Sequence, residues 1–230
     1  MAIHIEARDG YGVLTLDRQD KANAYDRSHL DALEAGFIEL SAAAHVVVIR
    51  AAGSGAFCGG ADLQEMRSAT PEDARNLRSQ AIFTTIARSP AITIAAVGGP
   101  AIGGGCELAL ATDIRIVGPR ARFRLPETSL GILPAAGGCT RLHRLVGTSL
   151  AKQLILGGRT IGAEAACRIG LAMELADDPE QAAFALATEL SQRDPEALRM
   201  AKEIIDRAAE DESLEAERSA QALLYARRES

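Results

Sequence analysis

The chain has 230 residues, which is the size of one large domain or of a domain with a small appendage. Hydrophobic residues make up 47% of it and charged residues 24%, a balance that excludes disordered and collagen-like proteins. Asp and Glu outnumber Lys and Arg by 31 to 25, which gives a net charge of −6. This charge argues against a nucleic-acid partner, because phosphate binding requires a basic face.

The sequence also argues against a secreted or membrane protein. The first nine residues lack the apolar run of a signal peptide. The longest uncharged stretch, residues 89–106, holds two prolines and five glycines, so we expect a strand and a turn there and no membrane helix. Four widely spaced cysteines without a C-x-x-C pair are expected to be reduced core residues; they are Cys58, Cys106, Cys139 and Cys167. These features predict a cytoplasmic protein without a metal site.

Strands and helices alternate in the first half of the chain. The expected elements are, in chain order, a hairpin over residues 3–16, a helix over 26–40, a strand over 46–49, a helix over 70–88, a strand over 91–97, a short helix over 103–112 and a strand over 114–117. The strands are rich in β-branched residues, and the helices repeat apolar residues every three or four positions. This alternation predicts an α/β fold.

The pattern changes in the second half of the chain. From residue 149 onward it is almost entirely helical, with new amphipathic segments expected to begin at Asp194 and Ser213. We therefore divide the chain into an α/β core over residues 1–175 and a helical C-terminal region over residues 176–230.

Several common functional signatures are missing from the sequence. It has no phosphate-binding P-loop and no complete G-x-G-x-x-G after a predicted strand. It also has neither the G-x-S-x-G motif of serine hydrolases nor the H-E-x-x-H zinc motif. The four histidines are scattered, and His143 is expected at the surface of a helix. Nucleotide, acyl-serine and metal chemistry are therefore disfavoured.

Two glycine-rich loops, residues 57–63 and residues 101–108, each follow a predicted buried strand. Glycine lets a backbone approach a ligand closely, and N–H groups at a helix start point outward with the positive end of the helix dipole. Lying side by side, the two loops would aim two N–H donors at one oxygen, which is an oxyanion hole. Taken singly, each loop is ordinary turn chemistry, so both interpretations stay open at this point.

Two acidic residues accompany these loops. Glu107 lies in the first turn of the short helix, where it would also stabilise the helix dipole. Glu127 lies in a mostly uncharged loop, where it would also be an ordinary exposed acid. If they face one oxyanion hole, the two acids form a general acid/base pair whose pKa values apolar surroundings raise. The residues alone do not decide between these interpretations.

The most specific signal is a set of motifs in a fixed order. They are Lys21–Ala24, Ala56–Leu63, Ala91–Ala109, Asp113–Ile116, Phe123, Pro126–Glu127, Leu130–Gly131, Pro134 and Gly137–Gly138. Together they cover roughly residues 10–175 and resemble the crotonase (enoyl-CoA hydratase/isomerase) superfamily. The resemblance implies a crotonase-like spiral of ββα units, with a C-terminal helical region that builds a homotrimer or a homohexamer.

The resemblance also implies a site. The substrate is expected to be an acyl-CoA thioester, so coenzyme A enters as part of the substrate and no separate cofactor is needed. The two oxyanion-hole amides fall on Ala61 and Gly104, and the two catalytic glutamates fall on Glu107 and Glu127. Further residues are expected to bind the substrate; they are Lys21, Ala24, Gly60, Asp62, Leu63, Pro134 and Ala135.

Because both glutamates are present, the resemblance implies an enoyl-CoA hydratase, a lyase that adds water across the 2,3 double bond through an enolate-like transition state. The alternatives are an enoyl-CoA isomerase or other acyl-CoA enolate chemistry, and a catalytically weak acyl-CoA binding subunit. Two departures from the family pattern are expected to matter. Ala135 stands where the family usually has Gly, which narrows the space beside the acids. The C-terminal helix that closes the acyl pocket in the family is expected to be shortened, since the sequence stops at Ser230.

Overall fold

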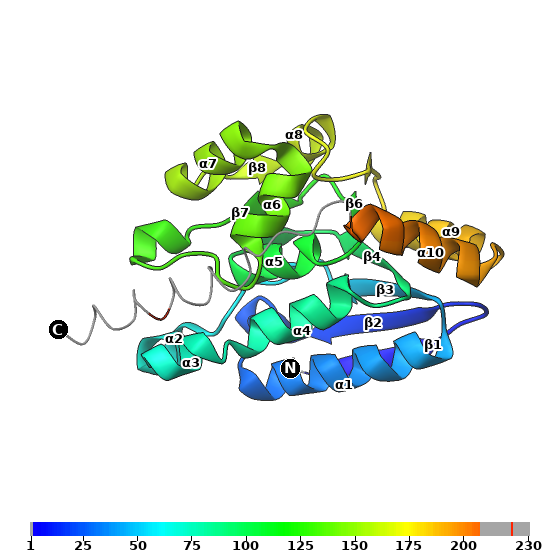
Figure 1. The fold of residues 1–230 in the computed structure, drawn as a ribbon, viewed down its shortest axis with the longest axis horizontal. Coiled ribbons are helices and arrows are strands. Elements are labelled where there is room, and N and C mark those ends of the chain that lie inside the picture. The colour runs from blue at the N-terminus through cyan, green and yellow to red at the C-terminus, as the bar shows by residue number, and fades with distance from the viewer. Residues whose placement is uncertain (1, 208–221, 223–230) are drawn as a thin grey trace.

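The computed structural model describes residues 2–207 and residue 222, and its strands and helices form layers (Figure 1). The strands are β1 (Ala2–Ala7), β2 (Gly12–Asp17), β3 (Val46–Ala51), β4 (Ile92–Val97), β5 (Pro100–Ile102), β6 (Ile114–Val117), β7 (Arg122–Arg124), β8 (Ile161–Gly162) and β9 (Glu174–Leu175). The α-helices are α1 (Arg27–Ala43), α2 (Leu63–Ser68), α3 (Pro71–Arg75), α4 (Arg78–Ala87), α5 (Gly104–Leu110), α6 (Gly138–Val146), α7 (Thr148–Gly157), α8 (Ala163–Arg168), α9 (Pro179–Ser191) and α10 (Pro195–Arg207). Two 3-10 helices are η1 (Gln19–Lys21) and η2 (Glu127–Leu130). The predicted α/β class is confirmed.

The large sheet has six strands in the order β1-β2-β3-β4-β6-β9. The predicted N-terminal hairpin is present, because β1 runs antiparallel to β2, whereas the other neighbouring pairs are parallel. Consecutive side chains of a strand point to opposite faces, so in β3 Val47 and Ile49 enter one core while Val46 and Val48 enter another. Both faces of the sheet are therefore buried, as is usual for parallel strands.

Helices cover the two faces. On one face α1 and α4 contribute Phe37 and Phe83, which are fully buried in the main core. On the other face α9 packs through Ala183, Phe184 and Ala187 against strands of the large sheet. Helix α9, from the region predicted as the helical C-terminal part, thus shares a core with the region predicted over residues 1–175.

A smaller sheet has the strand order β5-β7-β8. The chain leaves β4 through Gly98–Gly99, joins the small sheet as β5 and then enters α5. It repeats this path through β6, β7 and η2. Two consecutive strands followed by a helical segment are therefore the repeating unit. The two passages deliver Gly104 and Glu127 as the first residues of their helical segments.

The prediction of a single helix over residues 70–88 is wrong. The chain forms two helices there, α3 and α4, with a break at Asn76 and Leu77. The Asn76 side chain donates to the carbonyl and to the carboxylate of Glu72, and such local bonds compete with helix continuation. The predicted start at Thr70 is present, with its side chain bonded to the N–H group of Asp73.

The described part of the chain after residue 149 is mostly helical, as expected. The sequence did not predict the two strands β8 and β9 in this region, because each is two residues long and leaves no periodic pattern. The expectation that all four cysteines are core residues needs correction. Only Cys58 and Cys106 are buried, whereas Cys139 and Cys167 are partly exposed, although all four are free thiols.

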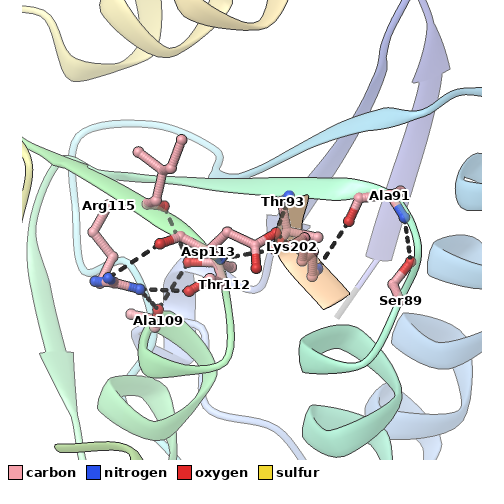
Figure 2. Close-up of polar contacts among 9 residues, drawn as sticks. Ser89, Ala91, Thr93, Ala109, Thr112, Asp113, Arg115 and Lys202 are labelled. Atoms are coloured by element: carbon pink, nitrogen blue, oxygen red, sulfur yellow. Dashed lines mark hydrogen bonds and ion pairs between the residues drawn. The ribbon is translucent and has the colours of Figure 1, made fainter. Parts of the chain in front are cut away.

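One polar cluster fixes α10 to the large sheet (Figure 2). Lys202 donates from Nζ to Asp113 Oδ2 at 2.8 Å and to the Ala91 carbonyl at 3.0 Å. The same Asp113 oxygen accepts hydrogen bonds from the N–H group and the hydroxyl of Thr93. One carboxylate therefore joins α10 to β4 and to the start of β6.

Helix α10 begins at Pro195, next to the predicted start at Asp194, whereas the start predicted at Ser213 lies outside the described residues. Helices among the described residues are too short or too polar to cross a bilayer.

Candidate active site

The two glycine-rich loops lie against each other. Gly60 has a φ of +91°, and a Cβ at this position would lie 3.1 Å from the Gly104 nitrogen and 2.8 Å from the Ile102 oxygen. Glycine suits both the left-handed backbone and the close approach. A β-bridge between Cys58 and Ala101 joins the loops just before this point. The structure therefore brings together the two loops that the sequence left unplaced.

The amides of Ala61 and Gly104 belong to these loops. Gly104 is the first residue of α5, where a helix leaves its N–H groups without intrahelical partners. Ala61 lies in a bridge with Tyr25 whose two bonds are made by the nitrogens of Tyr25 and Asp62, so the Ala61 N–H is not used in it. In the part of the chain that the structure describes, neither N–H donates to a protein acceptor. Both are available to an oxygen of a bound molecule.

Glu107 lies in the first turn of α5, three residues after Gly104, and is 4% exposed. Its Oε1 atom accepts hydrogen bonds of 2.8 Å from the N–H groups of Ala136 and Gly138. A Cβ on Gly138 would lie 2.9 Å from this oxygen, so glycine lets α6 begin directly on the carboxylate. The acid therefore faces the turn before α6 and does more than stabilise the dipole of its own helix.

The turn that binds Glu107 is held from two helices. Gln80, in the first turn of α4, donates to the Ala135 carbonyl at 2.7 Å. Arg141, in α6, donates to the Ala136 carbonyl at 2.8 Å. Sequence reasoning missed both side chains, because neither lies in a glycine-rich loop or beside an acid in the chain. The helical spacing of α4 signals which residues face the core, but not which carbonyl they meet.

Glu127 is the first residue of η2 and is 8% exposed, so the interpretation as an ordinary exposed acid is wrong. A Cβ on Gly103 would lie 3.0 Å from Glu127 Oε1, which puts the carboxyl group beside the residue that precedes Gly104. Its Oε2 atom is buried and has no hydrogen-bond partner among the described residues. Burial raises the pKa of Glu127 from 4.5 to about 7, because the charged form is poorly solvated there.

In addition to burial, the charges of the two acids raise the pKa values of the same two neighbours, Cys106 and Tyr25. Burial raises the pKa of the Cys106 thiol, and the charges of Glu127 and Glu107 raise it further. Burial also raises the pKa of the Tyr25 hydroxyl, with further contributions from Glu107 and Glu127. The acids, the two amides and the Tyr25 hydroxyl thus gather around the N-terminal turn of α5. Tyr25 follows the first family motif directly, but a lone aromatic residue is usually a core residue, so sequence reasoning missed it.

Four of the residues predicted to bind substrate lie around the first glycine-rich loop; they are Ala24, Gly60, Asp62 and Leu63. Asp62 caps α2 and pairs with Arg18 at 3.4 Å. Arg18 also donates to the Ala24 carbonyl at 2.9 Å. This partly buried cation, which sequence reasoning missed, joins the two segments. Lys21 is exposed in η1.

The remaining two residues predicted to bind substrate, Pro134 and Ala135, are buried in the turn before α6. A residue near the C-terminus, Ala222, is also buried, in a small cluster with Ala74 of α3 and Ile132 after η2. Ala222 therefore lies against α3 and the segment that follows η2.

Known proteins resemble this chain over most of its length. The family profile described as enoyl-CoA hydratase/isomerase matches residues 6–229. The probable enoyl-CoA hydratase echA8 of Mycobacterium bovis is 40% identical over 229 residues, which cover 98% of this chain and 87% of that protein. The short-chain-enoyl-CoA hydratase of Clostridium acetobutylicum is 35% identical over 209 residues, 88% of this chain and 80% of that protein. Among solved structures, the enoyl-CoA hydratase from Bacillus anthracis superposes with a TM-score of 0.86 at 33% identity, over 98% of this chain and 91% of that chain.

Proposed function

Since this chain belongs to the enoyl-CoA hydratase/isomerase family, we propose that it is an enoyl-CoA hydratase that adds water to 2-enoyl-CoA thioesters. Relatives named as enoyl-CoA hydratases, 35% and 40% identical, support this function. The observation that carries it is the pair of buried acids, Glu107 and Glu127, beside the glycines that begin α5. Hydration needs a base that takes a proton from the water and an acid that gives a proton to C2 of the substrate. The isomerase alternative, which moves one proton within the substrate, is not favoured.

The proposed oxyanion hole consists of the Ala61 and Gly104 amides. Addition of water to C3 moves negative charge onto the thioester oxygen, which becomes enolate-like. Two fixed N–H donors at that oxygen stabilise the transition state more than the substrate, and removal of one such donor typically costs about 10²–10³ in rate. That both N–H groups lack a partner in the described part of the chain supports this role.

In the proposed mechanism Glu107 holds the water and takes one of its protons while the oxygen attacks C3. Glu127 delivers its proton to C2, so the two acids exchange roles and a solvent proton exchange restores them. A carboxyl group with a pKa of about 7 holds a proton at neutral pH and still releases it readily, which is what a general acid requires.

The substrate is an acyl-CoA, and coenzyme A enters with it, so the proposed reaction uses no separate cofactor. The residues proposed to bind the substrate are Lys21, Ala24, Gly60, Asp62, Leu63, Pro134 and Ala135. For all of them except Lys21, which is exposed in η1, a position in the segments next to Ala61 or in the turn that holds Glu107 supports this assignment.

We also propose that the chain assembles as a homotrimer, or as a homohexamer built from two trimers. Helix α10 exposes three large apolar side chains, Met200, Ile204 and Ile205, with exposed fractions of 49%, 66% and 68%. A cavity of about 1070 Å³ lies between α10 and the helices α4 and α6. An apolar helix face of this kind marks a protein interface. The free thiols fit a reducing compartment such as the cytoplasm.

Crotonyl-CoA provides the test of this function. Water addition removes the conjugation between the double bond and the thioester, so the folded protein should cause a steady loss of the enone absorbance. No loss at high protein concentration contradicts the proposal. If the protein instead turns a 3-enoyl-CoA into the conjugated product, it is an isomerase. If it binds acyl-CoA and converts neither compound, it is a binding subunit.

A further inference from the structure

Tyr25 touches both loops of the proposed oxyanion hole. Its backbone forms the β-bridge with Ala61: the Tyr25 N–H donates to the Gly60 carbonyl at 2.8 Å, and its carbonyl accepts from the Asp62 N–H at 2.7 Å. These two bonds lie on either side of the Ala61 amide. The backbone of Tyr25 therefore sets the position of the first donor.

The side chain of Tyr25 reaches the second donor. A Cβ on Gly104 would overlap the Tyr25 hydroxyl oxygen and would lie 2.8 Å from Cζ and 3.1 Å from Cε1. The end of the tyrosine side chain thus lies directly against the Gly104 backbone. The three heavy atoms nearest to that position all belong to Tyr25. The hydroxyl end of Tyr25 is therefore the closest neighbour of the Gly104 backbone on this side.

The side chain is itself firmly held. The residue is 6% exposed, and the side chain of Ser79, in the first turn of α4, interacts with its hydroxyl and lowers the pKa that burial raises. Its ring meets the Phe83 ring edge to face, at a centroid distance of 5.9 Å and an angle of 89°. Two residues one helical turn apart on α4 therefore fix the ring and the hydroxyl.

From this geometry we propose that Tyr25 is a positioning residue of the oxyanion hole, which sets the separation of the Ala61 and Gly104 amides through its backbone on one side and its hydroxyl on the other. This inference rests on the proposed function, because it assigns a role to Tyr25 within that site. It gives the buried hydroxyl a purpose that packing alone would not require, since phenylalanine fills the same ring volume.

The expected effect is on the transition state. Misplacing a group by about 1 Å can cost about 10² in rate, and the donors act on charge that develops during the reaction. Tyr25→Phe leaves the ring on Phe83 but removes the hydroxyl, which is the side-chain atom nearest to the Gly104 position. We expect kcat for crotonyl-CoA to fall about tenfold with little change in KM. Ser79→Ala, which releases the hydroxyl, should lower kcat in the same direction and by less.

Tyr11→Phe is the matched control. Tyr11 has the same exposed fraction of 6%, and its ring packs on Phe184 on the opposite face of the large sheet. Its hydroxyl accepts a hydrogen bond from Arg8. Loss of this hydroxyl should leave both kcat and KM unchanged.

A spectroscopic measurement tests the proposed oxyanion hole without catalytic turnover. The absorbance of bound 2,4-hexadienoyl-CoA shifts to longer wavelength when N–H donors polarise its thioester carbonyl. In a Glu127→Gln background, adding Tyr25→Phe should reduce this shift, and adding Tyr11→Phe should not. Circular dichroism and the midpoint of thermal unfolding establish that each variant is folded.

The outcomes separate the two proposals. If Tyr25→Phe and Ser79→Ala keep the wild-type kcat and the full spectral shift, Tyr25 is a core residue only and the inference is wrong. If the wild-type protein shifts the dienoyl spectrum but hydrates no enoyl-CoA, the proposed function fails, and the shift in the variants still decides the role of Tyr25. If Tyr25→Phe is unstable, the Ser79→Ala measurement decides it.

Discussion

The Oε1 atom of Glu107 accepts a 2.8 Å hydrogen bond from the N–H group of Gly138, although the two residues lie 31 positions apart in the chain. The same oxygen accepts from the Ala136 N–H. The start of α6 is therefore fixed to an acid on α5, and the orientation of that acid depends on two amides from another segment.

The first prediction concerns Gly138→Ala. The new methyl group would lie 2.9 Å from Glu107 Oε1 and 2.6 Å from the Pro134 Cβ, so either the carboxylate or the turn must move. We expect kcat for crotonyl-CoA to fall about 10²-fold, as for a catalytic group displaced by about 1 Å. Gly157→Ala, at the end of α7, is the control, because its methyl group would make an ordinary 3.6 Å contact with the Arg159 side chain that follows the helix. Equal kcat values for the two variants would contradict the prediction.

The second prediction concerns the two acids as chemical groups. Glu107→Gln and Glu127→Gln keep the size of the side chains but remove the base and the acid, so each should lower kcat by about 10²–10⁴. Binding of a saturated acyl-CoA, measured by calorimetry, should change little. Glu164→Gln is the control, since this exposed acid of α8 lies in a surface pair with Arg168. An unchanged kcat in either active-site variant removes that residue from the mechanism.

The third prediction is a pH dependence of stability. Burial raises the pKa of Glu127 from 4.5 to about 7. Between these values the unfolded chain releases the proton while the folded protein keeps it, so the free energy of unfolding falls as the pH rises. The loss through this interval is about 3 kcal/mol, at 1.36 kcal/mol per pKa unit. Urea unfolding of the wild type and of Glu127→Gln at pH 4.5, 6 and 7.5 measures it; the difference between the two proteins should change with pH in this direction.

The fourth prediction concerns the cluster under α10. Lys202→Met leaves Asp113 without the ammonium group that lies 2.8 Å from it, although Thr93 still donates to the carboxylate. Removing one partner of a buried ion pair costs about 3 kcal/mol. The double variant Lys202→Met with Asp113→Asn should recover part of this loss, because no uncompensated charge remains. Lys152→Met on the exposed side of α7 is the control and should have almost no effect on urea unfolding.

Local sequence signals predicted the elements that deliver the site. The triple glycine before Glu107 marked the start of α5, and the β-branched run Val46–Ile49 marked a strand buried on both faces. These signals depend on neighbouring residues, so one sequence contains them. The family motifs added the expectation that Ala61 and Gly104 belong to one site.

Contacts between distant segments were beyond these signals. Gln80 and Ala135 meet across 55 positions, and nothing in the pattern of α4 distinguishes this glutamine from a surface residue. The break at Asn76 likewise depends on side-chain bonds to Glu72, which compete with a continuous helix that the composition also permits. The burial of Glu127 follows from the way η2 folds against Gly103. The residues around an acid in a loop do not indicate such packing.

Gly104 and Glu107 lie within one turn of the same short helix. In the proposed mechanism, one of these residues polarises the carbonyl and the other activates the water. The span from the Gly104 amide to the backbone of Glu107 is therefore fixed within α5, while the amides of Ala136 and Gly138 orient the carboxylate. Changes outside α5 leave that span unaltered, so selectivity for the acyl group can diverge while the chemical step is preserved.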